Sequence, residues 1–298
     1  MGRVASIVQS ISTRADLRGF VSSHRRAGRT VGFVPTMGAL HHGHMALVER
    51  CRAENDVTIV SIFVNPTQFG PNEDFDAYPR RIDHDLELCR SHGVDAVFHP
   101  GMQEMYPEPL RTVVEVAELS SILIGEQRPG HFRGVATVVA KLLNIVEPDR
   151  AYFGEKDFQQ LAVVRRMAFD LSMRATIVGV PTVREADGLA ASSRNLRLTP
   201  AERRVAPVVH QAMLDAKRLF ETGERDAATL LSAVRARAAS EPSIALLSCD
   251  LCDSATLGAL RRVADGPAVL LVTARLGSVV LIDQFELKPD LATGGPAA

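Results

Sequence analysis

The stretch TVGFVPTMGALHHGH, residues 30–44, decides how the first half of the chain is organised. Its first six residues are mostly apolar and β-branched or aromatic, which is typical of a strand buried on both faces. A helix is expected to begin at Gly43 and to continue to Glu54. A buried strand followed directly by a helix is the repeating unit of a parallel α/β sheet.

The same alternation continues outward from this stretch. Short apolar segments predict strands at 30–35, 57–65, 95–100, 111–116, 151–154 and 175–180. Amphipathic segments predict a first helix that is capped by Thr13 and runs towards Arg26, and further helices at 43–54, 80–91, 134–146 and 158–170. We therefore predict an α/β fold, with a doubly wound, Rossmann-like parallel sheet over residues 1–181.

A smaller α+β domain is predicted over residues 182–298. The alternation stops there, and a polar loop runs to Arg194. TPAE, residues 199–202, has the threonine, proline and glutamate of a capped helix start, so we expect a long helix after it and a second one near 226–239. Three strands follow, at 244–251, 268–276 and 278–287, and a tight LGS turn joins the last two.

The composition excludes several classes of protein. A net charge of -1 gives no excess that would favour nucleic acid or an anionic membrane surface. The longest apolar run, residues 268–272, is far shorter than the roughly 20 residues that span a bilayer, and the N-terminus does not resemble a secretory signal. Four cysteines suit a reducing compartment, and the CDLC pair lacks further zinc ligands nearby. We predict a cytoplasmic protein whose partners are small neutral or anionic molecules.

The histidines of PTMGALHHGH allow more than one interpretation. His41 and His44 are three residues apart at a helix start, so they should share a face, with His42 turned away. Open backbone N–H groups and the helix dipole would make this turn a phosphate site. A metal site is less well supported, because no Glu or Asp stands at the spacing of histidine-helix metal motifs. Histidines that merely pack in a loop are the third interpretation.

Three further polar stretches could carry chemistry. Lys156 of FGEKD can place a charge on a phosphate, and Asp157 can orient that lysine or bind a sugar hydroxyl. SSRN, residues 192–195, supplies hydroxyl and guanidinium donors that suit a triphosphate. Gln68 and Gln160 each offer a donor and an acceptor for a substrate hydroxyl. The first two stretches can also be read as an exposed ion pair and an ordinary polar turn.

Five motifs together resemble the pantoate-β-alanine ligase family. They are PTMGALHHGH, SIFVNPTQF, RPGHFRGV, FGEKDFQQL and DGLAASSRN, in this order between about residues 29 and 198, with a fainter continuation in ARLGSVVLID. The H-x-G-H element alone is shared with many adenylyl-transferring enzymes, whereas five motifs in register are highly specific. The resemblance implies a nucleotidyltransferase-type fold and a homodimer.

The resemblance also implies an AMP-forming ligase. The carboxylate of (R)-pantoate would attack the α-phosphate of ATP, giving pantoyl adenylate and pyrophosphate. The amine of β-alanine would then attack the acyl group, giving pantothenate and releasing AMP. Mg²⁺ is expected with the triphosphate, although the sequence names no protein ligand for it.

Residue roles follow from the resemblance, motif by motif. His44 would donate to the phosphates with His41 as its partner, and Lys156 would face the developing charge. Gln68 and Gln160 would hold pantoate, and Gln68 would also lie near β-alanine. The smaller domain would act as a lid. The catalytic set adds Ser192, Ser193 and Arg194, which close over the triphosphate. ATP would be lined by Met37, Gly38, Ala39, Leu40, His41, His42, Gly43, His44, Gly154, Glu155, Lys156, Asp157, Val183 through its backbone, Ala191, Ser192, Ser193 and Arg194.

Three positions depart from the family pattern. Ala191 stands where a larger Met or Leu is expected and would give up an apolar contact to the nucleotide, Thr67 stands where Met is common, and His42 where an acid or amide is common. Two other functions are compatible with parts of the pattern. One is a nucleotidyltransferase that moves AMP onto a phosphorylated acceptor, and the other is a non-catalytic nucleotide-binding module. The paired glutamines and the second domain favour acyl transfer over the nucleotidyltransferase. A non-catalytic module would have no need for Lys156, Ser192, Ser193 and Arg194 together.

Overall fold

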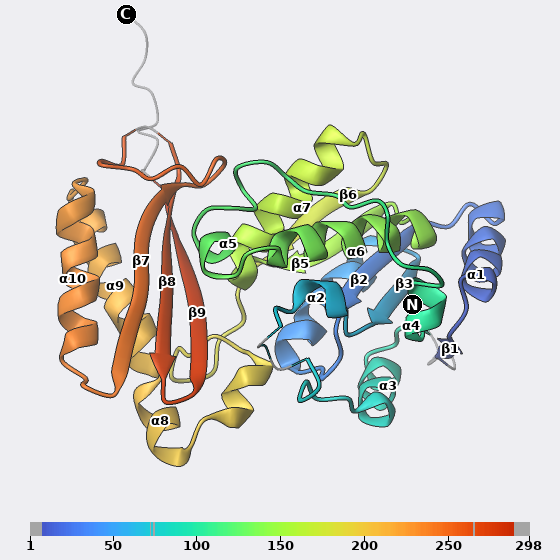
Figure 1. Cartoon of the computed structure of the whole chain (residues 1–298), viewed down its shortest axis with the longest axis horizontal. Coiled ribbons are helices and arrows are strands. Elements are labelled where there is room, and N and C mark those ends of the chain that lie inside the picture. Colours follow the sequence, from blue (N-terminus) through green and yellow to red (C-terminus); the bar gives the residue numbers. More distant parts are fainter. Residues whose placement is uncertain (1–7, 72, 74, 265, 289–298) are drawn as a thin grey trace, which may run out of the picture. The chain divides into compact units, whose positions relative to one another are not determined.

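The computed structural model describes residues 8–71, 73, 75–264 and 266–288 (Figure 1). The chain divides into two compact units. The first comprises residues 1–155 and 159–181, and the second comprises residues 156–158 and 182–298. The first residues of the N-terminal stretch, in which we read no secretory signal, lie outside the described part.

The first unit is built on a six-stranded sheet in which every pair of neighbouring strands is parallel. In sheet order the strands are β1 (Gln9–Ile11), β4 (Ala96–Phe98), β3 (Val57–Ile62), β2 (Val31–Thr36), β5 (Arg150–Gly154) and β6 (Thr176–Val180). The chain adds β3 and β4 on one side of β2 and then returns to add β5 on the other side. This reversal confirms the doubly wound α/β fold.

Helices cover both faces of this sheet, which is why its strands are apolar throughout. They are α1 (Arg14–Arg26), α2 (His42–Glu54), α3 (Ile82–Ser91), α4 (Met102–Met105), α5 (Ile124–Gln127), α6 (His131–Val146) and α7 (Phe158–Asp170). Val34, Val60 and Val97 pack in one cluster with α2 and α3. Their strand neighbours alternate to the opposite face and are buried as well, where α1 and α6 contact each other and β2. In the described part of the chain, no helix has the length and apolarity needed to cross a membrane.

The predicted strand at 111–116 was wrong. This segment runs beside α6 outside the sheet, and the Val114 N–H donates to the Thr137 hydroxyl (2.9 Å) instead of to a neighbouring strand. Val113 is 54% exposed, so its apolar side chain does not mark a buried strand. The sixth strand of the sheet is β1, whose three residues are too few for alternation to reveal.

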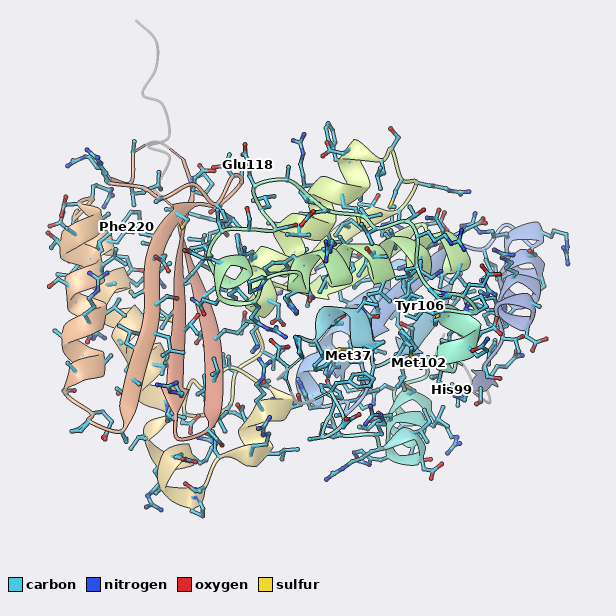
Figure 2. The ribbon with its side chains drawn as sticks, viewed as in Figure 1. Met37, His99, Met102, Tyr106, Glu118 and Phe220 are labelled. Carbon is cyan, nitrogen blue, oxygen red and sulfur yellow. The ribbon has the colours of Figure 1, made fainter. Side chains whose placement is uncertain are left out.

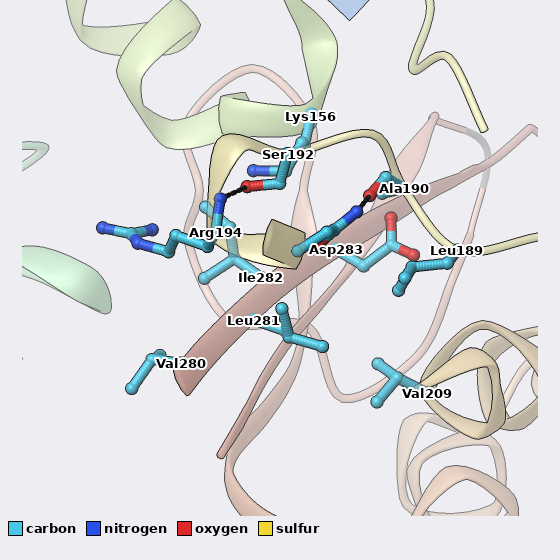
Figure 3. Close-up of a pocket in the computed structure, with 11 residues that line it drawn as sticks. Lys156, Leu189, Ala190, Ser192, Arg194, Val209, Val280, Leu281, Ile282 and Asp283 are labelled. Carbon is cyan, nitrogen blue, oxygen red and sulfur yellow. Dashed lines mark hydrogen bonds between the residues drawn. The ribbon is translucent and has the colours of Figure 1, made fainter. Parts of the chain in front are cut away.

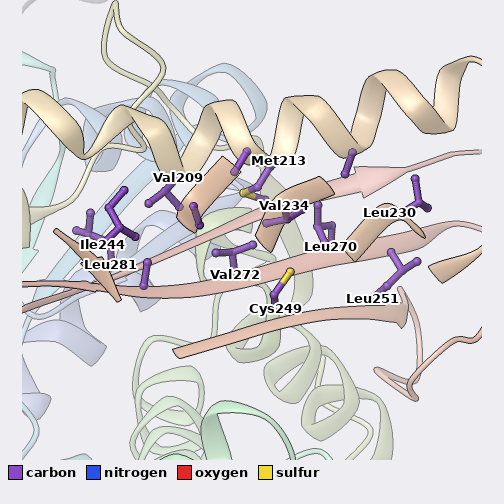
Figure 4. Packing of buried hydrophobic residues seen from close by; sticks show 14 of the residues in the cluster. Val209, Met213, Leu230, Val234, Ile244, Cys249, Leu251, Leu270, Val272 and Leu281 are labelled. Atoms are coloured by element: carbon purple, nitrogen blue, oxygen red, sulfur yellow. The ribbon is translucent and has the colours of Figure 1, made fainter. Parts of the chain in front are cut away.

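The second unit packs helices on a three-stranded antiparallel sheet (Figure 4). The strands β7 (Ile244–Asp253), β8 (Ala268–Leu276) and β9 (Val279–Leu287) pair in sequence order. Met213 on α9 (Pro207–Glu221) and Leu230 on α10 (Ala227–Ala239) are buried with Leu270 of β8 in its core. Gly277 provides the left-handed backbone (φ 55°) of the predicted turn between β8 and β9.

The long helix predicted after TPAE is two helices. Its start is as expected, because the Thr199 hydroxyl accepts from the Glu202 N–H (3.3 Å) and the Glu202 carboxylate accepts from the Thr199 N–H (2.8 Å). The first helix, α8 (Pro200–Val205), ends before Pro207, where α9 begins. Proline lacks an N–H and clashes with the preceding turn, so it ends one helix and starts the next.

Leu230→Ala should lower the free energy of unfolding by about 2–5 kcal/mol, because it opens a cavity in the core of the second unit. Leu230 is fully buried, whereas Leu196 is 78% exposed. The matched control Leu196→Ala should therefore change stability by no more than about 0.5 kcal/mol. Urea unfolding followed by circular dichroism measures both, and equal effects would contradict the packing described.

Candidate active site

The turn between β2 and α2 carries the three histidines of PTMGALHHGH. His41 is the N-cap of α2, and its Nδ1 accepts a hydrogen bond from the Gly43 N–H (3.1 Å). Nδ1 of His44 accepts in turn from the His41 N–H (3.3 Å). The two imidazoles thus form a capping box, with ring centroids 4.1 Å apart. His42 is exposed, while His41 and His44 are half-buried.

The capping box fixes the tautomer of both rings. A neutral imidazole that accepts at Nδ1 carries its proton on Nε2. The donors to Nδ1 are backbone N–H groups, which have no acceptor form, so the assignment does not depend on a rotating hydroxyl. His41 and His44 therefore each carry an Nε2–H donor, the form that suits an anionic ligand.

Most backbone N–H groups of this turn are satisfied within the protein. We expected open N–H groups at the helix start, as in phosphate-binding turns built from amides. Internal acceptors instead take the N–H groups of Gly38, Ala39, Leu40, His41, Gly43, His44 and Met45. An anion at this turn would therefore be recognised mainly by side-chain donors.

A buried carboxylate from α3 holds the same loop. Asp85 is 1% exposed, and its two oxygens accept from the N–H groups of Ala39 (2.9 Å) and Leu40 (2.8 Å). The loop takes left-handed backbone at Gly38 (φ 85°) and Ala39 (φ 51°). A Cβ at Gly38 would lie 3.0 Å from Asp85 Oδ2, so glycine allows this close approach. Burial raises the pKa of Asp85, against the opposite effect of the two backbone hydrogen bonds.

We did not single out Asp85 from the sequence, although one signal was present. Asp85 and Cys89 are four residues apart and form the buried side of α3. A carboxylate on the buried face of a helix requires internal donors, because burying an unpaired charge costs far more than folding can supply. The pattern indicates that such a partner exists but does not identify the loop that provides it.

The turn after β3 places Gln68 beside Met37. Gln68 ends the short helix η1 (Pro66–Gln68), is 8% exposed, and its Nε2 donates to Met37 Sδ (3.1 Å). Helix α6 comes very close to this turn at Gly134, where a Cβ would lie 2.3 Å from the Thr67 carbonyl oxygen. Two of the predicted residues, from the ends of different strands, are thus in contact.

The end of β5 lies at the same edge of the sheet, because β5 pairs in parallel with β2. Gly154 is its last residue, and Glu155 starts the short helix η2 (Glu155–Asp157). The Lys156 side chain is only 15% exposed, and its Nζ lies 3.7 Å from the Asp157 carboxylate. The two side chains are therefore neighbours, and the orienting role considered for Asp157 stays a prediction.

The two glutamines at the start of α7 differ in their surroundings. Gln159 is buried, and its amide is used within the fold: Oε1 accepts from the Ile124 N–H (3.1 Å), and Nε2 donates to the carbonyls of Leu119 (2.9 Å) and Ile122 (2.8 Å). Gln160 is half-buried. Gln159 therefore stabilises the turn formed by residues 119–124. Gln160 stays the candidate for binding substrate.

The remaining candidates lie in the second unit. The Val183 carbonyl accepts from the Ala191 N–H (2.9 Å), so the two predicted nucleotide positions are adjacent. Ser192 caps the short helix η3 (Ser193–Arg197) by accepting from the Arg194 N–H (3.3 Å). Lys156, Ser192 and Arg194 line a pocket of about 10 Å³ (Figure 3). That volume suits about one water molecule, so this pocket by itself is not a nucleotide site.

Among the described residues, no group of three or more His, Cys, Asp and Glu side chains is arranged to hold a metal ion. The CDLC cysteines are buried and free, and burial raises the pKa of Cys249 to about 12 and that of Cys252 to about 11. Zinc is bound by thiolates, which these environments disfavour. The capping box gives the histidines another structural reason for their spacing.

The sequence matches the family model described as pantoate-beta-alanine ligase over residues 9–286. The chain belongs to the pantoate-β-alanine ligase family. A pantothenate synthetase of Rhizobium meliloti (strain 1021) is 52% identical over 285 residues, which cover 96% of this chain and 98% of that protein. This match confirms the resemblance drawn from the five motifs and shows that the chain is a ligase.

Solved structures of the family have the same fold. That of the Thermus thermophilus enzyme superposes with a TM-score of 0.90 at 47% identity, covering 95% of this chain and all of that one (100%). The Francisella tularensis ligase was solved in complex with beta-gamma ATP and beta-alanine. It superposes with a TM-score of 0.76 at 32% identity, over 93% of this chain and 97% of that one. The roles of individual residues stay predictions.

Asp85→Asn should remove a pH-dependent contribution to stability. The folded-state pKa of Asp85 is raised, so the folded protein holds this proton more tightly than the unfolded chain, whose aspartates titrate near about 3.9. The stability of the unmutated protein relative to the variant should therefore fall as the pH rises from the pKa of Asp85 in the unfolded chain to its pKa in the folded protein. Urea unfolding of both proteins across that range measures the difference, and a rise with pH would contradict the assignment.

Asp253→Asn is the matched control, with the opposite sign. The Thr256 N–H donates to the Asp253 carboxylate (2.8 Å) and holds the pKa of that carboxyl below its usual value. The stability of the unmutated protein relative to this variant should therefore be present at neutral pH and be lost as the pH falls through the folded-state value.

Proposed function

We propose that this chain condenses (R)-pantoate with β-alanine at the expense of ATP, through a pantoyl adenylate, giving pantothenate, AMP and pyrophosphate. The observation that carries the proposal is the family match over residues 9–286. The ATP compound and β-alanine in the complex of the Francisella tularensis relative support the choice of these two substrates. The description of the matching family names pantoate as the substrate joined to β-alanine.

The first step needs donors for growing negative charge. A carboxylate oxygen of pantoate attacks the α-phosphorus, the bond from that phosphorus to the pyrophosphate breaks, and charge accumulates on the phosphoryl oxygens and the leaving group. We assign the Nε2–H of His44, supported by His41, and the ammonium of Lys156 to this charge. Ser192, Ser193 and Arg194 are assigned to the triphosphate. Donors held in place before the reaction lower the barrier most, because they need no reorganisation.

The second step transfers the acyl group. The amine of β-alanine attacks the acyl carbon of the adenylate, an amide bond forms, and AMP leaves with the electrons of the broken acyl–oxygen bond, while the nitrogen gives up one proton to water. We assign Gln68 and Gln160 to pantoate, and Gln68 also to the vicinity of β-alanine. The adenylate is prone to hydrolysis, so we assign the second unit the role of a lid that keeps water out.

The nucleotide is assigned to the loops that follow β2 and β5 and to the polar loop of the second unit. These are residues 37–44, 154–157, 183 and 191–194. Internal bonding already occupies most amides of the first loop, so its contribution would come mainly from the imidazoles and from carbonyl groups. The Val183 carbonyl keeps a second lone pair beyond its bond to Ala191, which is available to an adenine amino group.

Mg²⁺ belongs to the proposal as a companion of the triphosphate. The described residues offer no cluster of three carboxylate, histidine or cysteine ligands. Mg²⁺ in nucleotide sites is commonly held by one or two carboxylates together with phosphate oxygens and water, and the absence of a larger cluster is compatible with that mode. When bound, the ion would neutralise phosphate charge. The homodimer and the cytoplasmic location also stay predictions.

Isotope exchange between ATP and pyrophosphate tests the proposal against its two alternatives. Exchange should require pantoate, and AMP should accumulate once β-alanine is added. A nucleotidyltransferase acting on a phosphorylated acceptor would show exchange only when that acceptor is supplied, with or without pantoate. A non-catalytic nucleotide-binding module would show neither exchange nor AMP, and either result would remove the proposed reaction.

His44→Ala and Lys156→Ala should each lose at least about 3 kcal/mol of transition-state stabilisation, which is a loss of more than about a hundredfold in kcat/KM. Each variant removes a donor assigned to charge that grows in the first step. His24→Ala on α1 and Lys217→Ala on α9 remove the same side chains at positions without an assigned role, and they should retain normal rates. Near-normal rates in the first pair would exclude those residues from the mechanism.

A further inference from the structure

The side-chain amide of Asn65 lies at the centre of a buried hydrogen-bond network after β3. Asn65 is 1% exposed. Its Oδ1 accepts from the hydroxyls of Tyr106 (2.8 Å) and Thr67 (3.1 Å) and from the Thr67 N–H (3.4 Å). Its Nδ2 donates to the Gln68 Oε1 (3.1 Å) and to the Gly134 carbonyl (3.3 Å). Both ends of this amide therefore have partners of the correct type.

Two backbone groups decide which way the Asn65 amide points. The Thr67 N–H can only donate, and the Gly134 carbonyl can only accept. A flipped amide would set its NH₂ group against the Thr67 N–H and its oxygen against the Gly134 oxygen. The orientation of Asn65 thus follows from fixed chemistry and is independent of hydroxyl rotation.

Asn65 in turn decides which way the Gln68 amide points. Its Nδ2 can only donate, so the group of Gln68 that faces it must be the oxygen, Oε1. The other end of the Gln68 amide, Nε2, then faces Met37 Sδ (3.1 Å). His131 Nδ1 lies 2.8 Å from the Gln68 carbonyl oxygen, so the backbone of this residue is held as well. The Asn65 bond takes one of the two lone pairs of Gln68 Oε1, and the amide is oriented so that its N–H donors at Nε2 face away from Asn65.

The hydrogen bond from Gln68 Nε2 to Met37 Sδ is weak. A thioether sulfur is a poor hydrogen-bond acceptor, and methionine is flexible enough to move aside. A hydroxyl or carboxylate oxygen of a substrate would compete successfully with Met37 for the Gln68 Nε2. The arrangement therefore favours a ligand that brings an acceptor oxygen to this position.

Tyr106 and Thr67 add two hydroxyl donors to the Asn65 oxygen. Tyr106 follows α4 and is half-buried (Figure 2), packed against Phe63 with ring centroids 6.0 Å apart. Burial raises the pKa of Tyr106, so its hydroxyl stays protonated and able to donate. The Thr67 hydroxyl supplies a bond to Asn65 that an apolar side chain at this position would not.

We propose that Tyr106 and Thr67 are positioning residues that, through Asn65, hold the Gln68 amide with its N–H groups towards pantoate. This inference rests on the proposed function, because it takes Gln68 as part of the pantoate site. Neither hydroxyl touches Gln68 itself in this arrangement, and both act on the amide that orients it. The result is selectivity for an acceptor oxygen at the Gln68 position.

A double-mutant cycle between Tyr106→Phe and Gln68→Ala tests the inference. Tyr106→Phe should raise KM for pantoate about threefold to tenfold, the size expected for one neutral hydrogen bond, and leave KM for ATP within about twofold. In the Gln68→Ala background the same change should alter KM for pantoate less than about twofold. Thr67→Val, which keeps the side-chain shape, should act in the same direction as Tyr106→Phe.

Tyr152→Phe is the matched control for loss of a buried, hydrogen-bonded phenol hydroxyl. Tyr152 is fully buried in β5, and its hydroxyl accepts from Asn55 (2.7 Å) and donates to Glu54 (2.9 Å). This variant should lower the unfolding temperature without changing KM for pantoate.

Three outcomes separate the possibilities. Coupling between Tyr106 and Gln68 supports the positioning role. An equal rise of KM in both backgrounds, or no rise at all, overturns it while leaving the proposed reaction intact. If the unmutated enzyme shows no pantoate-dependent exchange, the proposed function fails, and the inference fails with it.

Discussion

Strands β2 and β5 pair in parallel although the chain builds β3 and β4 on the far side of β2 before it returns. This reversal is the constraint on which the candidate site of the first unit depends. At such a point the loops that leave two neighbouring strands turn to opposite faces of the sheet and leave a crevice between them. The Met37–His44 loop leaves β2 and Glu155 follows β5, so the fold itself brings these segments to one edge.

Buried polar groups from other elements then give these loops their shape. Asp85 of α3 accepts from two N–H groups of the β2 loop, and Asn65 orients Gln68 after β3. Each buried polar group in these contacts needs its hydrogen-bond partner, because a buried donor or acceptor without a partner lowers the stability of the fold by about 1–3 kcal/mol. A loop that departed from this conformation would leave Asp85 buried without donors. The site is thus shaped by satisfied polar groups behind it as well as by the residues that face the ligand.

Local patterns predicted the helix starts and most of the sheet, because their causes lie within a few residues. Thr199 with Glu202, and His41 with His44, show their geometry in their spacing alone. The predictions fail where a residue distant in the sequence determines the local structure. Residues 111–116 have the composition of a strand but bond to Thr137 on α6, and β1 becomes a strand only because β4 offers it an edge. Asp85 was missed for the same reason, since its partners are about forty-five residues away in sequence.

Most amides of the β2 loop, which we expected to be open to phosphate, have acceptors within the protein. The capping box uses Nδ1 of both imidazoles, and this use leaves the Nε2–H of each as a donor. A ring with protons on both nitrogens would leave the Gly43 or His41 N–H without its acceptor, so the helix start and the donor form of the histidines are one arrangement. Gln68 is oriented in a similar way, because Asn65 Nδ2 donates to its Oε1. His41, His44 and Gln68 thus each present an N–H donor, a group that suits ligands with carboxylate or phosphate oxygens.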